Sequence, residues 1–104
     1  MTDRELLELA AKAAGTELGS WCEELNAFWK EELGTFIWNP LEDDGDALRL
    51  AVKLSLTVYH WPDEICVCNE KGTINEDVAR VGDIYAATRR AIVNAAAEIG
   101  RNMR

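Results

Sequence analysis

The sequence has few of the residues from which disulfide frameworks and common active sites are built. It contains one histidine, two prolines and three cysteines among 104 residues. An odd number of cysteines cannot pair completely, and the N-terminus lacks the basic start and apolar centre of a signal peptide. The scarcity of proline and the lack of low-complexity tracts argue against extensive disorder. We therefore expect a folded chain with reduced thiols in the cytoplasm.

Long hydrophobic runs are also missing. No apolar run approaches the roughly 20 residues that a membrane-spanning helix requires, so no membrane span is expected. With 48% hydrophobic and 29% charged residues, the composition is typical of soluble globular proteins. A chain of 104 residues suits one hydrophobic core, and we predict a single domain over residues 1–104.

Basic residues are scarce in one part of the chain. The net charge is -8, and residues 17–46 contain nine acidic residues against one base, Lys30. This balance argues against direct binding to nucleic acids or anionic membranes, because phosphate attracts positive charge. Two interpretations of the acidic segment stay open. It is either a solvated face that favours solubility, or a surface presented to a basic partner. A narrower form of the second interpretation is that the segment imitates the negative charge of a nucleic acid.

Helix signals occur at both ends of the chain. Thr2 and Glu5 have the spacing of a capping box, and Gly15 is placed to end the helix that they open. A second long helical pattern begins near Asp83, and Gly100 is expected to end it.

The stretch 38–54 is expected to be the structural centre of the chain. A short strand ends at Asn39-Pro40, and Asp43 or Asp44 is expected to cap the helix that follows. Clustered carboxylates also suit calcium or magnesium, but the order of residues 43–46 does not match an EF-hand loop, so capping is favoured. The expected buried stripe of this helix is Ala47, Leu50, Ala51 and Leu54, widened by Leu48.

The remaining segments favour strands. Residues 56–61 and 65–69 alternate and are joined by Pro62-Asp63, which predicts a hairpin. Periodicity does not decide residues 16–37, where the glutamates with Leu25 and Leu33 would also suit a helix, but the aromatic residues favour short strands around 18–23 and 27–31. A further short strand is expected at 35–38, whereas 71–73 is expected to be a turn and 74–82 a loop. Both faces of the hairpin are largely apolar, which favours a sheet covered on both sides. The predicted fold class is α+β, an antiparallel sheet of about 3–5 short strands covered by about three helices in a helix/sheet/helix sandwich.

No catalytic motif stands out. Cys66 and Cys68 would share one strand face and, with Cys22 or His60, could supply metal ligands, but paired CxxC motifs are missing. Alternation places His60 on the opposite face, which disfavours a thiol-imidazole pair. Phosphate-binding glycine loops, GxSxG and HExxH are missing too. We therefore expect no enzyme and no cofactor, with a small metal- or thiol-dependent enzyme as the least favoured alternative.

Binding residues are the stronger candidates. Four tryptophans are many for this length, and they either fill the core or anchor a protein partner. The candidate partner-binding residues are Trp21, Glu23, Glu24, Trp29, Glu31, Glu32 and Trp61. The alternative is a small-molecule binder for a nucleotide signal, in which converging helices would direct Arg49, Lys53, Arg89 and Arg90 to phosphates.

Three segments resemble the small phage and prophage proteins of the phage ABA sandwich type. They are the opening MTDRELLELA, the stretch from Trp38-Asn39-Pro40-Leu41 through residue 54, and residues 87–100. The resemblance implies a helix/sheet/helix sandwich encoded in a phage accessory region and acting in the host cytoplasm. It supplies no catalytic residues. Residues 16–36 and 62–84 lie outside it, and partner specificity is expected there.

Together these features predict a noncatalytic accessory protein that binds a host macromolecule. The phage resemblance points to a component of a bacterial defence system as the partner, and the protein would then inhibit that system. An edge strand in a small sheet also leaves a homodimer open, because its backbone must be covered or paired.

Overall fold

The computed structural model describes residues 2–31, 35–70, 72–77 and 82–103, which form three helices and six strands. The helices are α1 (Asp3–Ala14), α2 (Asp44–Lys53) and α4 (Ile84–Arg101). The first three strands are β1 (Trp21–Cys22), β2 (Ala27–Glu31) and β3 (Thr35–Trp38). The others are β4 (Thr57–Trp61), β5 (Glu64–Asn69) and β6 (Gly72–Asp77). The predicted α+β class is confirmed.

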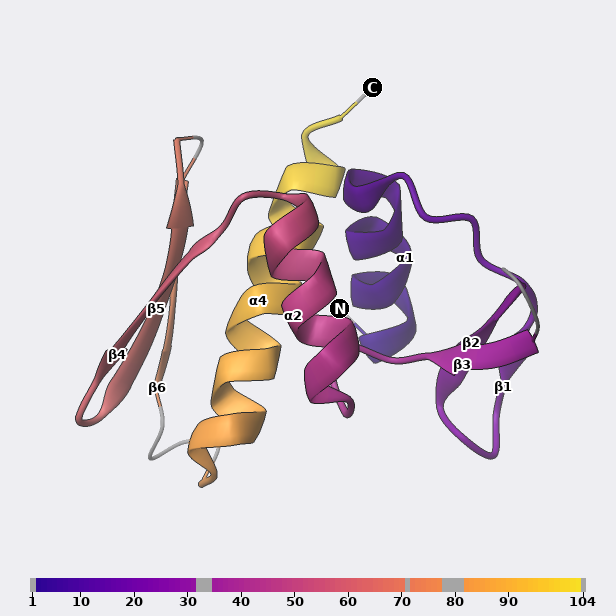
Figure 1. The fold of residues 1–104 in the computed structure, drawn as a ribbon, viewed down its shortest axis with the longest axis horizontal. Helices are drawn as coiled ribbons and strands as arrows, with labels where there is room; N and C mark the ends of the chain where they lie inside the picture. Colours follow the sequence, from indigo (N-terminus) through magenta and orange to yellow (C-terminus); the bar gives the residue numbers. More distant parts are fainter. Residues whose placement is uncertain (1, 32–34, 71, 78–81, 104) are drawn as a thin grey trace.

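The strands form two antiparallel sheets, ordered β1-β2-β3 and β4-β5-β6, with three strands each. Figure 1 shows the helices between them, with β4-β5-β6 beside α4 and β1-β2-β3 on the far side of α1. The small sandwich of antiparallel strands and three helices is therefore as predicted, but the strands are divided between two sheets. The short segment 35–38 pairs with β2 and never joins the β4-β5 hairpin.

Helix α4 is the central element of the fold. It packs against α1, α2, β5 and β6, and its contact with α1 is the most extensive between any two elements. Such contact on several sides requires a helix that is apolar around most of its circumference, with side chains small enough for close approach. Its buried residues are Ala87, Ala91, Ile92, Val93, Ala95, Ala96, Ala97 and Gly100.

Gly100 was expected to end α4, but it does not. The helix continues to Arg101, and Gly100 is buried against α1, where an added Cβ would overlap the carbonyl oxygen of Leu9. The glycine is needed here because two helix backbones meet, and not because the chain must turn. Asn102 is the C-cap instead.

The predicted helix starts are confirmed by local hydrogen bonds. Thr2 Oγ1 accepts from the Glu5 amide at 3.2 Å, and Asp43 Oδ2 accepts from the Asp46 amide at 2.7 Å. Asp83 caps α4 in the same way. Gly15, with a φ of 70°, ends α1 in the left-handed conformation that glycine tolerates best. These caps satisfy backbone groups that a helix end leaves unpaired.

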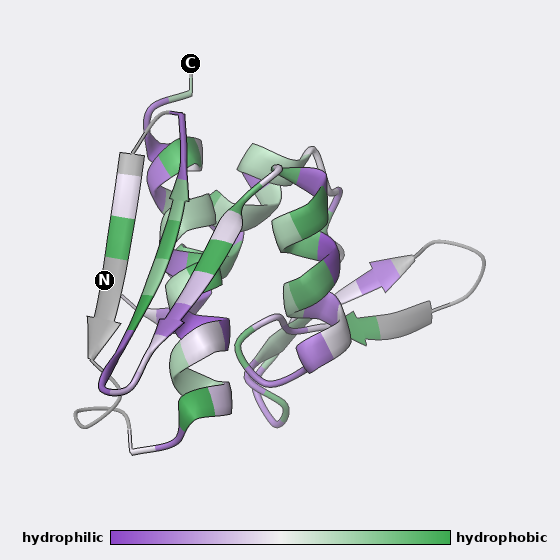
Figure 2. Cartoon of the chain, turned by 60° about the vertical axis from the view of Figure 1, so that its left-hand side comes forward, coloured by the Kyte–Doolittle hydropathy of each residue, from purple (hydrophilic) through white to green (hydrophobic). Residues whose placement is uncertain are grey.

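The predicted hairpin forms with the expected register, since Val58 pairs with Val67 and Tyr59 with Cys66. Ile65 and Val67 are fully buried on the face that meets α4, and the middle of β5 is strongly hydrophobic (Figure 2). The expectation that both faces are covered is wrong for the outer face, where Tyr59 is 49% and Trp61 57% exposed.

Two further expectations differ from the structure. Residues 72–77 form strand β6, paired with β5, where a turn and a loop were predicted. Polar residues gave no strand pattern there, and cross-strand pairing with β5 and the packing of Ile74 on the core stabilise the strand instead. Residues 78–81 of the predicted loop lie outside the described residues.

Leu48, expected in the buried stripe of α2, is 63% exposed because the helix turns Ala47, Leu50 and Ala51 inward.

Replacing Gly100 with alanine should destabilise the protein by roughly 1–3 kcal/mol, because the new methyl group would separate α1 from α4. Helix propensity alone predicts the opposite sign, a gain of up to about 1 kcal/mol. Urea unfolding of the two proteins measures the difference. A more stable alanine variant would contradict the close approach of the helices.

Candidate functional site

One residue of the acidic run before α2, Asp46, is part of the internal structure. Asp46 is 5% exposed and accepts from the Asn39 amide at 2.9 Å and from Arg49 Nη2 at 2.7 Å. Asn39 Oδ1 in turn accepts from the Leu41 amide at 3.1 Å. These bonds fix the chain between β3 and α2, and they use carboxylates that a metal or a basic partner would otherwise contact.

The arginines assigned to a phosphate site are engaged by carboxylates. Arg89, 14% exposed, donates from Nη1 to Asp44 at 2.6 Å and from Nε to the Leu41 carbonyl at 2.9 Å. Arg90 Nη2 lies 3.5 Å from Asp3 Oδ1. The pKa of the Arg49 guanidinium is raised, chiefly by its hydrogen bond to Asp46 and further by Asp43, against the opposing effect of desolvation. Arg89 and Arg90 thus connect α4 with α2 and α1, whereas Arg49 pairs within its own helix and its N-cap.

Arg49 and Lys53 do share a surface cavity of about 390 Å³ at the end of α1, but Arg89 and Arg90 do not line it. Lys30 lines it as well, and so does Glu17, whose negative charge opposes an anionic ligand. The four predicted phosphate ligands are therefore not brought to one place. The remaining lining residues are Ala14, Gly15, Thr16, Trp38 and Leu50.

Replacing Asp46 with asparagine should destabilise the protein by about 1–3 kcal/mol, because either the buried Asn39 amide or the Arg49 guanidinium would lose its acceptor. The control is Asp63→Asn, in an exposed turn, which should change the free energy of unfolding by less than about 0.5 kcal/mol. Thermal or urea unfolding compares them. Equal stabilities would show that the Asp46 bonds do not hold α2 in place.

The candidate partner-binding residues lie in two separate regions. Trp21 is partly buried, with its ring edge-to-face with Phe28 at 4.9 Å and the Arg4 guanidinium 5.3 Å from its centroid. Trp29 is half-buried on β2. Glu23 and Glu24 are exposed in the β1–β2 turn, whereas the Glu31 side chain and Glu32 lie outside the described part of the chain.

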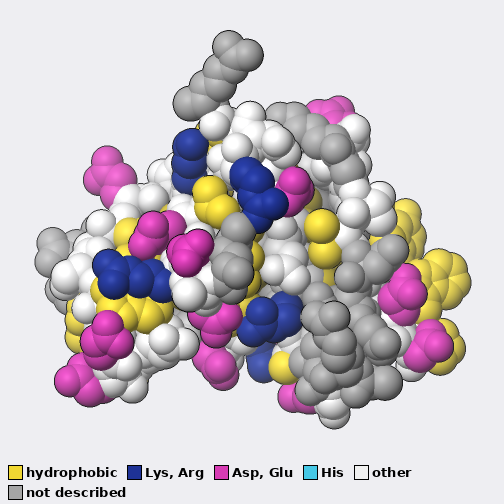
Figure 3. Space-filling view, turned by 180° about the vertical axis from the view of Figure 1, so that it is seen from behind, with side chains coloured by type: hydrophobic (Ala, Val, Ile, Leu, Met, Phe, Trp, Pro, Cys, Tyr) yellow, Lys and Arg dark blue, Asp and Glu magenta, His cyan; other side chains and the backbone are white. Residues whose placement is uncertain are grey.

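Trp61 lies on the other sheet, across the helix layer from Trp21 and Trp29 (Figure 1). With Tyr59, which the sequence analysis did not single out, it is exposed on the outer face of β4. Hydrophobic side chains gather on this side of the molecule, at the right of Figure 3, with acidic side chains beside them. Strand alternation with Trp61 was the signal that could have identified Tyr59.

Strand β4 is also an edge without the usual protection. It is terminal in its sheet, and its sequence Thr-Val-Tyr-His-Trp contains no aspartate, glutamate, lysine, arginine or proline. Edge strands are commonly kept from pairing by charges, proline or short length. The other edge of this sheet, β6, contains Glu76 and Asp77, and β1 has only two residues. Nothing else among the described strands pairs with the second side of β4.

The thiols and the histidine remain apart. Cys66 and Cys68 are half-buried on the outer face of β5, and Cys22 lies in the other sheet, 3.4 Å from Glu24 Oε2. His60 Nε2 lies 3.1 Å from Thr88 Oγ1, on the face toward α4. In the described ranges, no three histidine, cysteine or acidic side chains are placed to hold a metal ion. Partial burial is the main cause that raises the pKa of the Cys66 thiol, and the neighbouring Cys68 and Glu64 raise it further.

Alkylation of Cys66 by iodoacetamide should show a pH midpoint above that of the same cysteine in a peptide of residues 64–69. The folded protein holds this thiol proton more tightly, so less thiolate is present near neutral pH. For the same reason, this group's contribution to stability is lost as pH rises past the ordinary thiol pKa. Mass spectrometry across a pH series gives the midpoint, and a lower midpoint than in the peptide would indicate an activated thiol.

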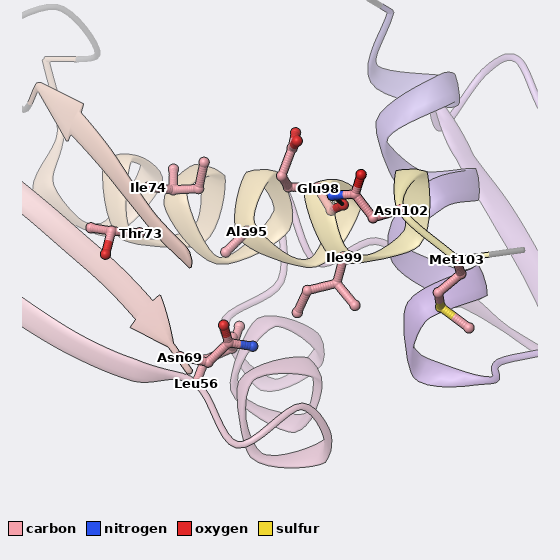
Figure 4. A pocket seen from close by; sticks show the side chains of 9 residues that line it. All are labelled: Leu56, Asn69, Thr73, Ile74, Ala95, Glu98, Ile99, Asn102 and Met103. Carbon is pink, nitrogen blue, oxygen red and sulfur yellow. Dashed lines mark hydrogen bonds between the residues drawn. The ribbon is translucent and has the colours of Figure 1, made fainter. Parts of the chain in front are cut away.

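A second cavity lies at the end of β4-β5-β6 opposite the β4–β5 turn. It has a volume of about 340 Å³ and lies between the strand ends and the last turns of α4 (Figure 4). Its position could not be predicted from the sequence, because its lining comes from β5, β6 and the last turns of α4. Its lining residues are Leu56, Asn69, Thr73, Ile74, Ala95, Glu98, Ile99, Asn102 and Met103.

No family model, curated protein or solved structure matches this chain. Its described helices include none with the length and hydrophobicity to cross a membrane.

Proposed function

We propose that this chain is a noncatalytic protein-binding module that pairs its edge strand β4 with an extended segment of another protein. The observation that carries the proposal is an uncharged edge strand with two exposed aromatic side chains, Tyr59 and Trp61. Folded proteins rarely leave such an edge unprotected unless it is used.

Two kinds of contact would act together at β4. In an antiparallel ladder every second residue directs its backbone N–H and C=O away from the existing neighbour, so β4 can accept a further strand. Tyr59 and Trp61 lie on the outer face and would pack against alternate side chains of that strand. Tyrosine and tryptophan are the residue types that most often dominate binding energy at interfaces.

The charges around the hairpin favour a partner with basic residues. Asp63 is exposed in the turn and Glu64 begins β5 beside it, while no lysine or arginine occurs between residues 54 and 70. Electrostatic complementarity of this kind mainly raises the association rate and specificity. The proposed partner segment is thus extended, apolar at alternate positions and flanked by lysine or arginine.

The resemblance to phage ABA sandwich proteins supports a bacterial partner. In this proposal the chain is a phage or prophage accessory protein, the partner belongs to the bacterial host, and binding takes place in the host cytoplasm. A component of a defence system is the proposed target, because an accessory protein without catalytic groups can inhibit such a system by occupying a surface of it.

The Tyr59→Lys variant should lose the partner that the unaltered protein captures from a bacterial lysate, with affinity falling by more than about tenfold. Tyr59 is half-exposed, so the fold should tolerate lysine there, and circular dichroism checks this. The matched control is Val52→Lys, which adds the same charge at an exposed position of α2.

Capture is followed by mass spectrometry at moderate salt, with affinity then measured on the purified partner. Retention of the partner by the control together with its loss from Tyr59→Lys supports binding through β4. Equal retention by both variants, or no stoichiometric partner for the unaltered protein, would contradict it.

A further inference from the structure

The cavity at the carboxyl end of α4 has the size of a small-ligand site. Its volume of about 340 Å³ falls at the lower end of the range for such sites, roughly 300–1,000 Å³. It lies by Leu56 and Asn69, which are at the opposite end of the β4–β5 hairpin from Trp61. A ligand here would leave the aromatic residues near the hairpin turn accessible.

The floor of the cavity is apolar. Leu56 precedes β4, Ile74 comes from β6, and Ile99 comes from α4 one turn after the buried Ala95 (Figure 4). Leu56 and Ile74 also pack against the hydrophobic core, which fixes their positions. These side chains present a surface on which a flat hydrophobic group can be removed from water.

The rim supplies oxygen atoms. Asn102 donates from Nδ2 to the Glu98 carbonyl at 2.9 Å, so its side-chain oxygen is the atom with which it can meet a ligand. The Glu98 carboxylate is half-exposed and lies 3.3 Å from Arg101 Nη1, an i,i+3 surface pair of the kind that contributes little and exchanges readily. No lysine or arginine is among the described residues that line the cavity.

We propose that this cavity binds a small organic cation, a primary amine on a flat apolar body. The apolar body lies against Leu56, Ile74 and Ile99, and the ammonium group meets the Glu98 carboxylate at the rim, with the Asn102 oxygen as a second acceptor. The Glu98 carboxylate in the described lining, and the acidic character of the chain, favour a cationic over an anionic ligand at this position. The site is independent of the proposed pairing of β4.

Two probes that share a ring and differ in charge test the proposal. Tryptamine carries an ammonium group and indole-3-propionate a carboxylate. Backbone amide shifts in an NMR titration should place tryptamine at residues 56, 69, 73–74 and 95–103, with a dissociation constant in the millimolar range expected for so small a ligand. Indole-3-propionate should bind at least about fivefold more weakly.

Glu98→Gln should weaken the binding of tryptamine by about fivefold, so that the protein no longer prefers tryptamine over indole-3-propionate. The matched control is Glu8→Gln, since Glu8 is similarly exposed and also pairs with an arginine of its own helix, Arg4. It lowers the net negative charge by the same amount, so it separates a specific contact from a general charge effect. The control should bind tryptamine as the unaltered protein does.

Ala95→Met adds a test of the apolar floor, because the longer side chain would occupy the cavity and abolish binding of both probes. If that variant does not fold, the Glu98→Gln result still decides. No amide shifts at the lining residues up to about 10 mM tryptamine, where a ligand of this size should bind, would overturn the proposal. Equal affinity for both probes, or equal effects of Glu98→Gln and Glu8→Gln, would overturn it as well.

Discussion

The close packing of α1 against α4 is the constraint on which the rest of the structure depends. Gly100 and the alanines of α4 let the two backbones approach, and α4 then presents other faces to α2, β5 and β6. Both sheets contact this helical layer. The β4-β5-β6 sheet packs on α4 through β5 and β6, and in the β1-β2-β3 sheet the ring of Trp21 contacts Arg4 of α1. A larger side chain at the helix crossing would therefore disturb contacts on both sides of the molecule.

The acidic run before α2 shows how charge serves the fold. Asp43 caps the helix, Asp44 pairs with Arg89 of α4, and the buried Asp46 connects Asn39 with Arg49. The Asp44–Arg89 pair orients α2 on α4, and these carboxylates neutralise part of the positive charge of Arg49 and Arg89. The net charge of the segment is thus a poor guide to its binding properties, whereas the uncharged strand β4 is the more informative surface.

The sequence predicted features that local chemistry decides. The caps at Thr2, Asp43 and Asp83 and the hairpin around Pro62-Asp63 depend on residues a few positions apart. Strand β6 and the role of Gly100 depend on distant elements, β5 and α1, and were not predictable from periodicity. The division of the strands between two sheets has the same origin.

The binding surfaces were predictable only in part. Trp21 and Trp61 have the same side chain, but Arg4 and Phe28 cover the first and no described residue stacks on the second. Composition cannot distinguish them, because coverage depends on the packing of α1 against β1-β2-β3. The cavity beside Ile99 likewise depends on tertiary packing, because its lining comes from strand ends and the last turns of α4.

Amide hydrogen exchange of the protein, alone and with its captured partner, tests most directly whether β4 is the binding edge. The amides of residues 57–61 that point away from β5 should exchange quickly in the free protein and become protected on binding, since a new strand would accept their hydrogen bonds. Protection confined to residues 17–31, with β4 unchanged, would contradict the account and assign binding to the acidic segment.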